Sequence, residues 1–194
     1  MSKLFKNYDE YIRLQSRKSK KTMYRTETHG WRREWIYKKM VAYGIKGNSI
    51  LCIGSRHRSE VDFFEAMGFS PVIGIDLFEA EKIHCCDMSK MLEDPFLKDQ
   101  KFDVVMSIES IEHCMDIDGF MKGLNQLCSQ YFICMCPIVK VPKKWDCGLY
   151  PFMMNLKNDQ DLKIKLESYF TQFSVIYCSM RQGGTRLFFM LKKK

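Results

Sequence analysis

The sequence lacks any apolar run approaching the roughly 20 residues that a membrane-spanning helix needs. The first residues also lack the apolar stretch of a secretory signal peptide. No internal repeat or low-complexity segment is present, and hydrophobic residues make up 46% of the 194 residues, enough for one packed core. These features predict an intracellular, cytoplasmic protein that does not interact with a membrane.

The nine cysteines include no Cys-x-x-Cys pair, which removes the main support for a zinc ribbon or a thioredoxin-type redox site. Cys134 and Cys136 lie two residues apart in an apolar run, as they would on one face of a buried strand. The cysteine pattern therefore favours free or structural thiols in a reducing compartment, and we expect no metal site.

Positive charge is confined to the first quarter of the chain. Residues 1–48 carry a net charge of +9, whereas residues 49–194 carry −1. Trp31, Trp35 and Tyr37 are interleaved with these cations. Such a segment can contact phosphates and stack on bases, but it can equally be a solvated helical arm that docks on the domain. We therefore predict a mainly helical N-terminal arm or lid, with nucleic acid as one partner class left open.

Short apolar runs alternate with helical segments from Ser49 onward. Five runs predict buried strands, at residues 49–54, 71–76, 82–87, 102–108 and 131–137. Helices are predicted at 59–69, 117–129 and 159–170, the first with Ser59 as its N-cap and Gly68 as its stop. Two last strands, at 173–180 and 185–192, form a hairpin through Gly183 and Gly184. This order predicts an α/β, Rossmann-like, doubly wound and mostly parallel sheet of about seven strands, with a C-terminal antiparallel hairpin.

Candidate site residues follow three of the predicted strands. In open α/β sheets, ligands bind beyond the carboxyl ends of the strands, where the strand order reverses. Gly54 ends the first strand and removes a side chain where the backbone would pass close to a ligand. Asp76 follows 22 residues later, at the spacing of an acid that accepts from ribose hydroxyls. Asp87 and Met88 come after the third strand, where they could hold an adenine, although Asp87 could also be a routine cap.

The turn GSRHR (54–58) is not a dinucleotide-binding loop. Such a loop needs further glycines so that backbone amides can approach a pyrophosphate, but this turn has no glycine after Gly54 and contains the long cations Arg56 and Arg58. S-adenosylmethionine carries no phosphate, and its methionine carboxylate could pair with Arg56 or Arg58. The turn therefore favours S-adenosylmethionine over NAD or FAD.

Three segments resemble motifs of class I S-adenosylmethionine-dependent methyltransferases: ILCIGSRHRSEVDFFEAMGFSPVIGIDL (50–77), HCCDM (84–88) and FDVVMSIESIEHCMD (102–116). The third resembles the branch that methylates small molecules, which often has a Glu-His pair after the strand. Members of this family usually have an acidic residue two positions before the first glycine, and this sequence has Cys52 there. The resemblance implies a methyltransferase acting on an oxygen or nitrogen of a small molecule; the alternative is a non-catalytic relative that binds RNA or a protein through its basic arm.

The resemblance also implies a role for each candidate residue. Gly54 and Ser55 would lie along the methionine part of S-adenosylmethionine, beside Arg56. Asp76 and Leu77 would hold its ribose, and Asp87 and Met88 its adenine. Ile108 and Glu109 would line the floor of the pocket near the methyl group. Glu112 and His113 are the candidate catalytic residues. His113 could act as a general base, or it could be an ordinary polar residue.

Overall fold

The computed structural model describes residues 10, 13, 17, 30–56, 58–114, 116–137, 158–181 and 186–194 of the chain. The strands are β1 (Ile50–Ile53), β2 (Val72–Asp76), β3 (Ile83–Cys85), β4 (Phe102–Ile108), β5 (Cys128–Pro137), β6 (Phe173–Arg181) and β7 (Arg186–Lys193). The helices are α2 (Gly30–Ala42), α3 (Arg58–Ala66), the short 3-10 helix η1 (Ile111–His113), α4 (Ile117–Leu127) and α6 (Asp159–Tyr169).

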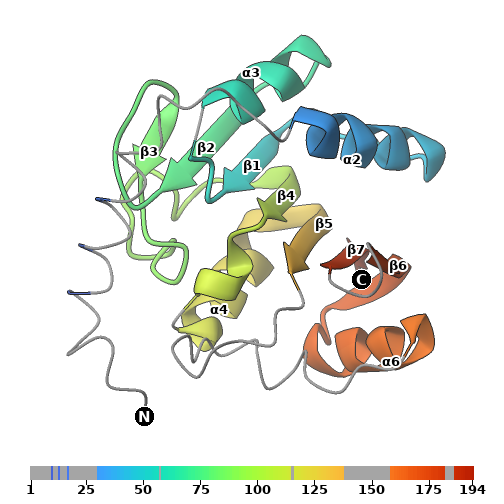
Figure 1. The fold of residues 1–194 in the computed structure, drawn as a ribbon. Coiled ribbons are helices and arrows are strands. Elements are labelled where there is room, and N and C mark those ends of the chain that lie inside the picture. The colour runs from blue at the N-terminus through green and yellow to red at the C-terminus, as the bar shows by residue number, and fades with distance from the viewer. Residues whose placement is uncertain are drawn as a thin grey trace.

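The seven strands form one sheet in the order β3-β2-β1-β4-β5-β7-β6 (Figure 1). The first five strands pair in parallel, and β7 runs antiparallel to both β5 and β6. The predicted strand–helix alternation with a terminal antiparallel pair is therefore confirmed. The strand order reverses between β1 and β4, so the ligand-binding edge of this sheet is expected at their carboxyl ends.

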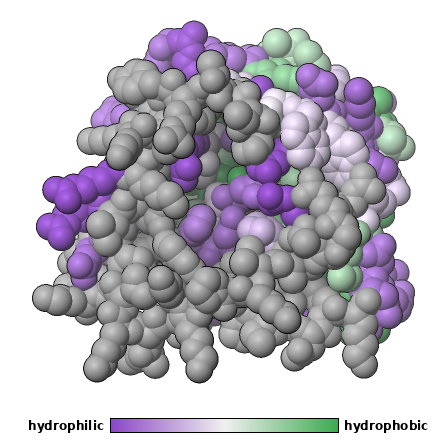
Figure 2. Space-filling view, in the orientation of Figure 1, coloured by the Kyte–Doolittle hydropathy of each residue, from purple (hydrophilic) through white to green (hydrophobic). Residues whose placement is uncertain are grey.

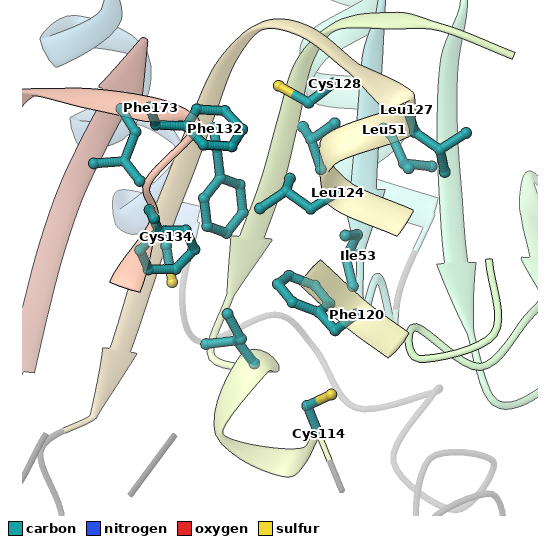
Figure 3. Close-up of a cluster of buried hydrophobic side chains, with 14 of the residues drawn as sticks. Leu51, Ile53, Cys114, Phe120, Leu124, Leu127, Cys128, Phe132, Cys134 and Phe173 are labelled. Atoms are coloured by element: carbon teal, nitrogen blue, oxygen red, sulfur yellow. The ribbon is translucent and has the colours of Figure 1, made fainter. Parts of the chain in front are cut away.

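Alternate residues of the central strands supply two hydrophobic clusters, one on each face of the sheet. Ile50 and Cys52 of β1 pack with α2 and α3, whereas Leu51 and Ile53 pack with α4 and α6. Strands buried on both faces need continuous apolar sequence, and this explains why β1 reads as an unbroken apolar run. Figure 3 shows the second cluster, in which Phe132 of β5 lies among the side chains from α4 and β1.

Two predicted boundaries differ from the structure. The fifth strand begins at Cys128 rather than at Tyr131, because Cys128 is buried and already pairs with Phe102 of β4. Ser59 was expected to be the N-cap of α3 but is its second residue. The predicted stop is confirmed: Gly68 has a left-handed backbone with φ +93° just beyond the helix.

Cys134 and Cys136 are fully buried in the same cluster, as the spacing predicted. The eight cysteines that the structure describes are all free thiols, and Cys147 lies outside the described residues. Burial raises the pKa of the Cys134 thiol, so Cys134 is a poor nucleophile and metal ligand. None of the described helices is long and apolar enough to cross a membrane.

The predicted basic arm is seen from Gly30 onward, where α2 packs on the sheet through the buried side chains of Ile36 and Met40. Trp35 adds an edge-to-face contact with Phe188 of β7, with ring centroids 4.6 Å apart. Most of residues 1–29, His57 and the hairpin loop with Gly183 and Gly184 lie outside the described residues.

Candidate functional site

The predicted site residues meet at one edge of the sheet. Ile53, the last residue of β1, pairs in register with Ile75 of β2 and with Ser107 of β4. Gly54, Asp76 and Ile108, the residues that follow, therefore lie side by side where the strand order reverses. Figure 2, drawn in the orientation of Figure 1, shows hydrophilic residues gathered near the middle of the view. The parallel register thus brings these candidate residues to one edge of the sheet, and their roles stay predictions.

Gly54 is required by a neighbour inside the protein. Its φ is +75°, and a Cβ built on it would lie 2.7 Å from Oγ of Ser110 and closer still to the Ser110 Cβ. Ser110 is held there because its Oγ donates to the carbonyl of Ile53 at 2.8 Å. Gly54 therefore makes room for Ser110, and its predicted approach to a ligand stays a prediction beside this structural role.

The amides of this turn are bonded within the protein. The N–H groups of Gly54 and Ser55 both donate to the carbonyl of Ile75, at 2.8 and 3.0 Å, and the Arg56 N–H donates to the carbonyl of Gly54 at 2.9 Å. A pyrophosphate would need such amides as donors. Their internal use supports the prediction that the turn does not bind a dinucleotide.

A carboxylate that sequence reasoning missed lies at the same turn. The Ser55 hydroxyl donates to Oε2 of Glu60, in the first turn of α3, at 2.5 Å. Burial and the Glu60 carboxylate raise the pKa of the Cys52 thiol well above its usual value. Glu60 thus places a carboxylate close to Cys52, the position where the resemblance expects an acid. The only sequence signal for Glu60 was an acid in the first turn of a helix.

Asp76 and Asp87 have different local partners. Oδ1 of Asp76 accepts from the Leu77 N–H at 2.6 Å, and its side chain is half-buried at the end of β2. Oδ1 of Asp87 accepts from the N–H and the hydroxyl of Ser89, at 2.9 and 2.8 Å, so Asp87 acts as a turn cap. Met88 packs against the hydrophobic cluster below it. A cofactor role for Asp87 stays a prediction beside its structural one.

Of the two arginines of the turn, Arg58 is engaged on the surface. It begins α3 and forms ion pairs with Asp62, at 3.1 Å, and with Glu81. Arg56 is half-buried. Arg56 is therefore the better candidate to pair with a carboxylate of a ligand.

An ionic cluster follows β4. Glu109 has a left-handed backbone with φ 55°, and its N–H donates to the carbonyl of Met135 at 2.7 Å. Its carboxylate forms ion pairs with Arg186, at the start of β7, and with Arg32 of α2, at 3.7 Å. Sequence reasoning missed both arginines, because Arg186 and Glu109 are 77 residues apart and no local pattern relates them.

Glu112 and His113, the predicted catalytic pair, lie in η1 directly after this cluster. The Glu112 side chain is buried, and desolvation raises its pKa to about 8. His113 is half-buried, with Nε2 3.9 Å from Oε1 of Glu112. A buried carboxyl with a raised pKa has the character of a general base or acid, so a catalytic role for Glu112 stays a prediction. No group of three potential metal ligands occurs among the described residues.

No protein-family model and no curated protein sequence matches the chain. Solved structures do. The 1,6-didemethyltoxoflavin-N1-methyltransferase of Burkholderia thailandensis, solved with its namesake compound and S-adenosylhomocysteine, matches with a TM-score of 0.65 over 100% of this chain and 93% of that one, at 12% identity. The chain has the class I methyltransferase fold.

Two further structures extend the similarity. The magnesium protoporphyrin IX methyltransferase of Synechocystis, solved with S-adenosylmethionine, has a TM-score of 0.55 and 14% identity, covering 86% of this chain and 80% of that one. An S-adenosylmethionine-dependent methyltransferase of Clostridium acetobutylicum has a TM-score of 0.57 and 11% identity, covering 96% and 98%. At these identities the similarity establishes the methyltransferase fold.

Proposed function

We propose that the protein is an S-adenosylmethionine-dependent methyltransferase that transfers the methyl group to an oxygen or nitrogen of a small molecule. The observation that carries the proposal is the side-by-side arrangement of Gly54, Asp76 and Ile108 at the strand-order reversal of a methyltransferase fold. The internally bonded amides of the 54–56 turn support the phosphate-free cofactor.

The described residues fit S-adenosylmethionine, which supplies an electrophilic methyl group on its sulfonium when bound. Asp76 would accept from the ribose hydroxyls, and Met88 would pack against the adenine. Arg56 would pair with the methionine carboxylate. Glu112 would receive the proton of the acceptor. Because the displacement is in line, positioning of the acceptor would supply much of the rate.

Isothermal titration of the full chain with S-adenosylmethionine and S-adenosylhomocysteine tests the proposal. Saturable binding of both is expected, since a methyltransferase must bind its cofactor and its product. Absence of binding would refute the proposal. It would favour the alternative of a non-catalytic protein that binds RNA or a protein through the basic arm.

The Arg56→Ala variant should weaken S-adenosylmethionine binding by roughly tenfold, because a charge-assisted pair with the methionine carboxylate is lost. Binding of adenosine, which lacks that carboxylate, should be unchanged. Arg58→Ala is the matched control, since Arg58 is already paired with Asp62 and Glu81. Calorimetry with both ligands measures the difference; equal losses for the two ligands in Arg56→Ala would indicate a role in shaping the turn instead.

A further inference from the structure

Glu109 is held in an unfavourable backbone conformation directly after β4. Its φ is +55°, and Lys82 is the only other non-glycine residue with a positive φ in the part of the chain that the structure describes. A non-glycine residue in this region costs free energy and persists only where its surroundings hold it there. Such residues concentrate at functional sites, and Glu109 lies where the strand order reverses. The contacts that hold Glu109 therefore bear on the candidate site.

Two arginines from different elements hold the Glu109 side chain. Arg186, at the start of β7, donates to Oε1 of Glu109. Nη1 of Arg32, in α2, lies 3.7 Å from Oε2. No more than 22% of any of the three side chains is exposed, so these ion pairs are screened less by water and salt than pairs on an open surface. The Glu109 carboxylate thus ties the turn after β4 to both α2 and β7.

Lys82 shows the same arrangement with the charges reversed. It also has a left-handed backbone, with φ 62°, and its ammonium pairs with Asp62 at 2.7 Å and with Glu65 at 2.6 Å, both on α3. In each case the left-handed residue is charged and lies between two opposite charges from other elements. The repetition indicates that the paired side chain is what fixes the backbone.

The residues on either side of Glu109 carry its conformation to the rest of the site. Ser110 donates to the carbonyl of Ile53 at 2.8 Å and packs where a Cβ on Gly54 would lie. Ile108 packs in the hydrophobic cluster that anchors α2. Because a change of φ at Glu109 redirects the chain that follows, it would move Ser110 away from Gly54. The turn after β4 therefore connects the N-terminal helix with the glycine turn.

We propose that Glu109 is a positioning residue for the binding of S-adenosylmethionine. Its ion pairs with Arg32 and Arg186 hold the turn after β4, and this turn holds Gly54 in the conformation that binds the cofactor. This inference rests on the proposed function and adds what keeps its cofactor site in shape. Without the pairs, the binding conformation is only partly populated, and the apparent affinity falls by that fraction. The carboxylate acts through the backbone and not by contact with the ligand.

The proposal makes α2 part of the cofactor-binding unit. The helix is anchored by its buried apolar side chains and by the contact between Trp35 and Phe188, and from there Arg32 reaches Glu109. Lys39, two turns later on the same helix, lies over the rings of Trp35 and Tyr177, at 5.6 and 5.0 Å. Lys39 therefore contributes to docking of the helix, whereas Arg32 links the helix to the site.

The test is calorimetric titration of the full chain with S-adenosylhomocysteine, well below the unfolding temperature of each variant, so that a loss of folding stability alone leaves the affinity unchanged. Glu109→Gln keeps the size of the side chain but removes its charge. It should weaken binding about tenfold, the factor expected when backbone strain of ordinary size is no longer offset. Glu109→Asn is the matched rescue variant. It is also uncharged, but asparagine adopts a left-handed backbone much more readily, so its affinity should stay within about threefold of wild type.

Variants of the arginines test the part of the N-terminal helix. Arg32→Gln should weaken S-adenosylhomocysteine binding by less than Glu109→Gln does. Arg32→Gln combined with Arg186→Gln should weaken it as much as Glu109→Gln, because all of these changes release one turn. Lys39→Gln, on the same helix, is the matched control and should bind like wild type. Arg32→Gln also decides the matter if Glu109→Gln does not fold.

Three results would overturn the proposal. Wild-type affinity in both Glu109→Gln and Arg32→Gln would show that the ion pairs are structural only, and the methyltransferase function would stand. Equal losses in Glu109→Gln and Glu109→Asn would mean that the carboxylate acts by its charge and not through the backbone. If S-adenosylhomocysteine does not bind the wild-type protein, the proposed function fails first, and this inference fails with it.

Discussion

Replacement of Gly54 by alanine should lower the free energy of unfolding by roughly 3–5 kcal/mol, the sum expected for a strained backbone and an overpacked core. Alanine at this position would need a φ of +75°, which L-residues rarely adopt, and its methyl group would press into Ser110. Ser110 cannot retreat without cost, because its hydroxyl bonds to the Ile53 carbonyl and to Ser107 Oγ at 2.7 Å. The substitution would therefore strain the junction of β1 and β4.

Chemical denaturation of Gly54→Ala measures the effect, with Gly44→Ala as the matched control. Gly44 also has a left-handed backbone, with φ +63°, but no atom lies within 4 Å of its built Cβ. It should lose only about 1 kcal/mol, from the backbone alone. Equal unfolding midpoints for the two variants would contradict close packing of Gly54 on Ser110.

The order of elements could be predicted because it depends on local patterns. The apolar run of β1 and the glycine turn that follows it are visible within ten residues of sequence. Once the sheet is parallel, register alone brings Gly54, Asp76 and Ile108 to one edge. That step requires no knowledge of which side chains contact one another.

The ionic cluster could not be predicted in the same way. Arg32, Glu109 and Arg186 come from α2, the end of β4 and the start of β7, and only the folded sheet brings them together. The packing role of Gly54 was missed for a related reason. Sequence shows that a side chain is missing but not which neighbour fills the space, and Ser110 was an ordinary polar residue in the pattern.

Asp76→Ala should weaken S-adenosylmethionine binding by about 1.5–3 kcal/mol, or roughly tenfold to more than a hundredfold, because hydrogen bonds from the ribose hydroxyls to a carboxylate are lost. Thermal stability without ligand should change little, since Asp76 is half-buried at the end of β2 and its carboxylate accepts from the neighbouring Leu77 N–H. Isothermal titration of Asp76→Ala and the wild-type protein with S-adenosylmethionine gives the two affinities.

Asp76→Asn refines the interpretation, because the amide keeps an acceptor oxygen but not the charge; an intermediate loss is expected. Asp62→Ala is the matched control, because Asp62 is a carboxylate on the surface of α3 that pairs with Arg58 and Lys82 and is not a candidate site residue. If Asp76→Ala binds S-adenosylmethionine as well as Asp62→Ala does, the ribose is not held by Asp76. A loss confined to Asp76, with adenosine affected as strongly as S-adenosylmethionine, would place the ribose at the end of β2, because adenosine carries the ribose but not the methionine.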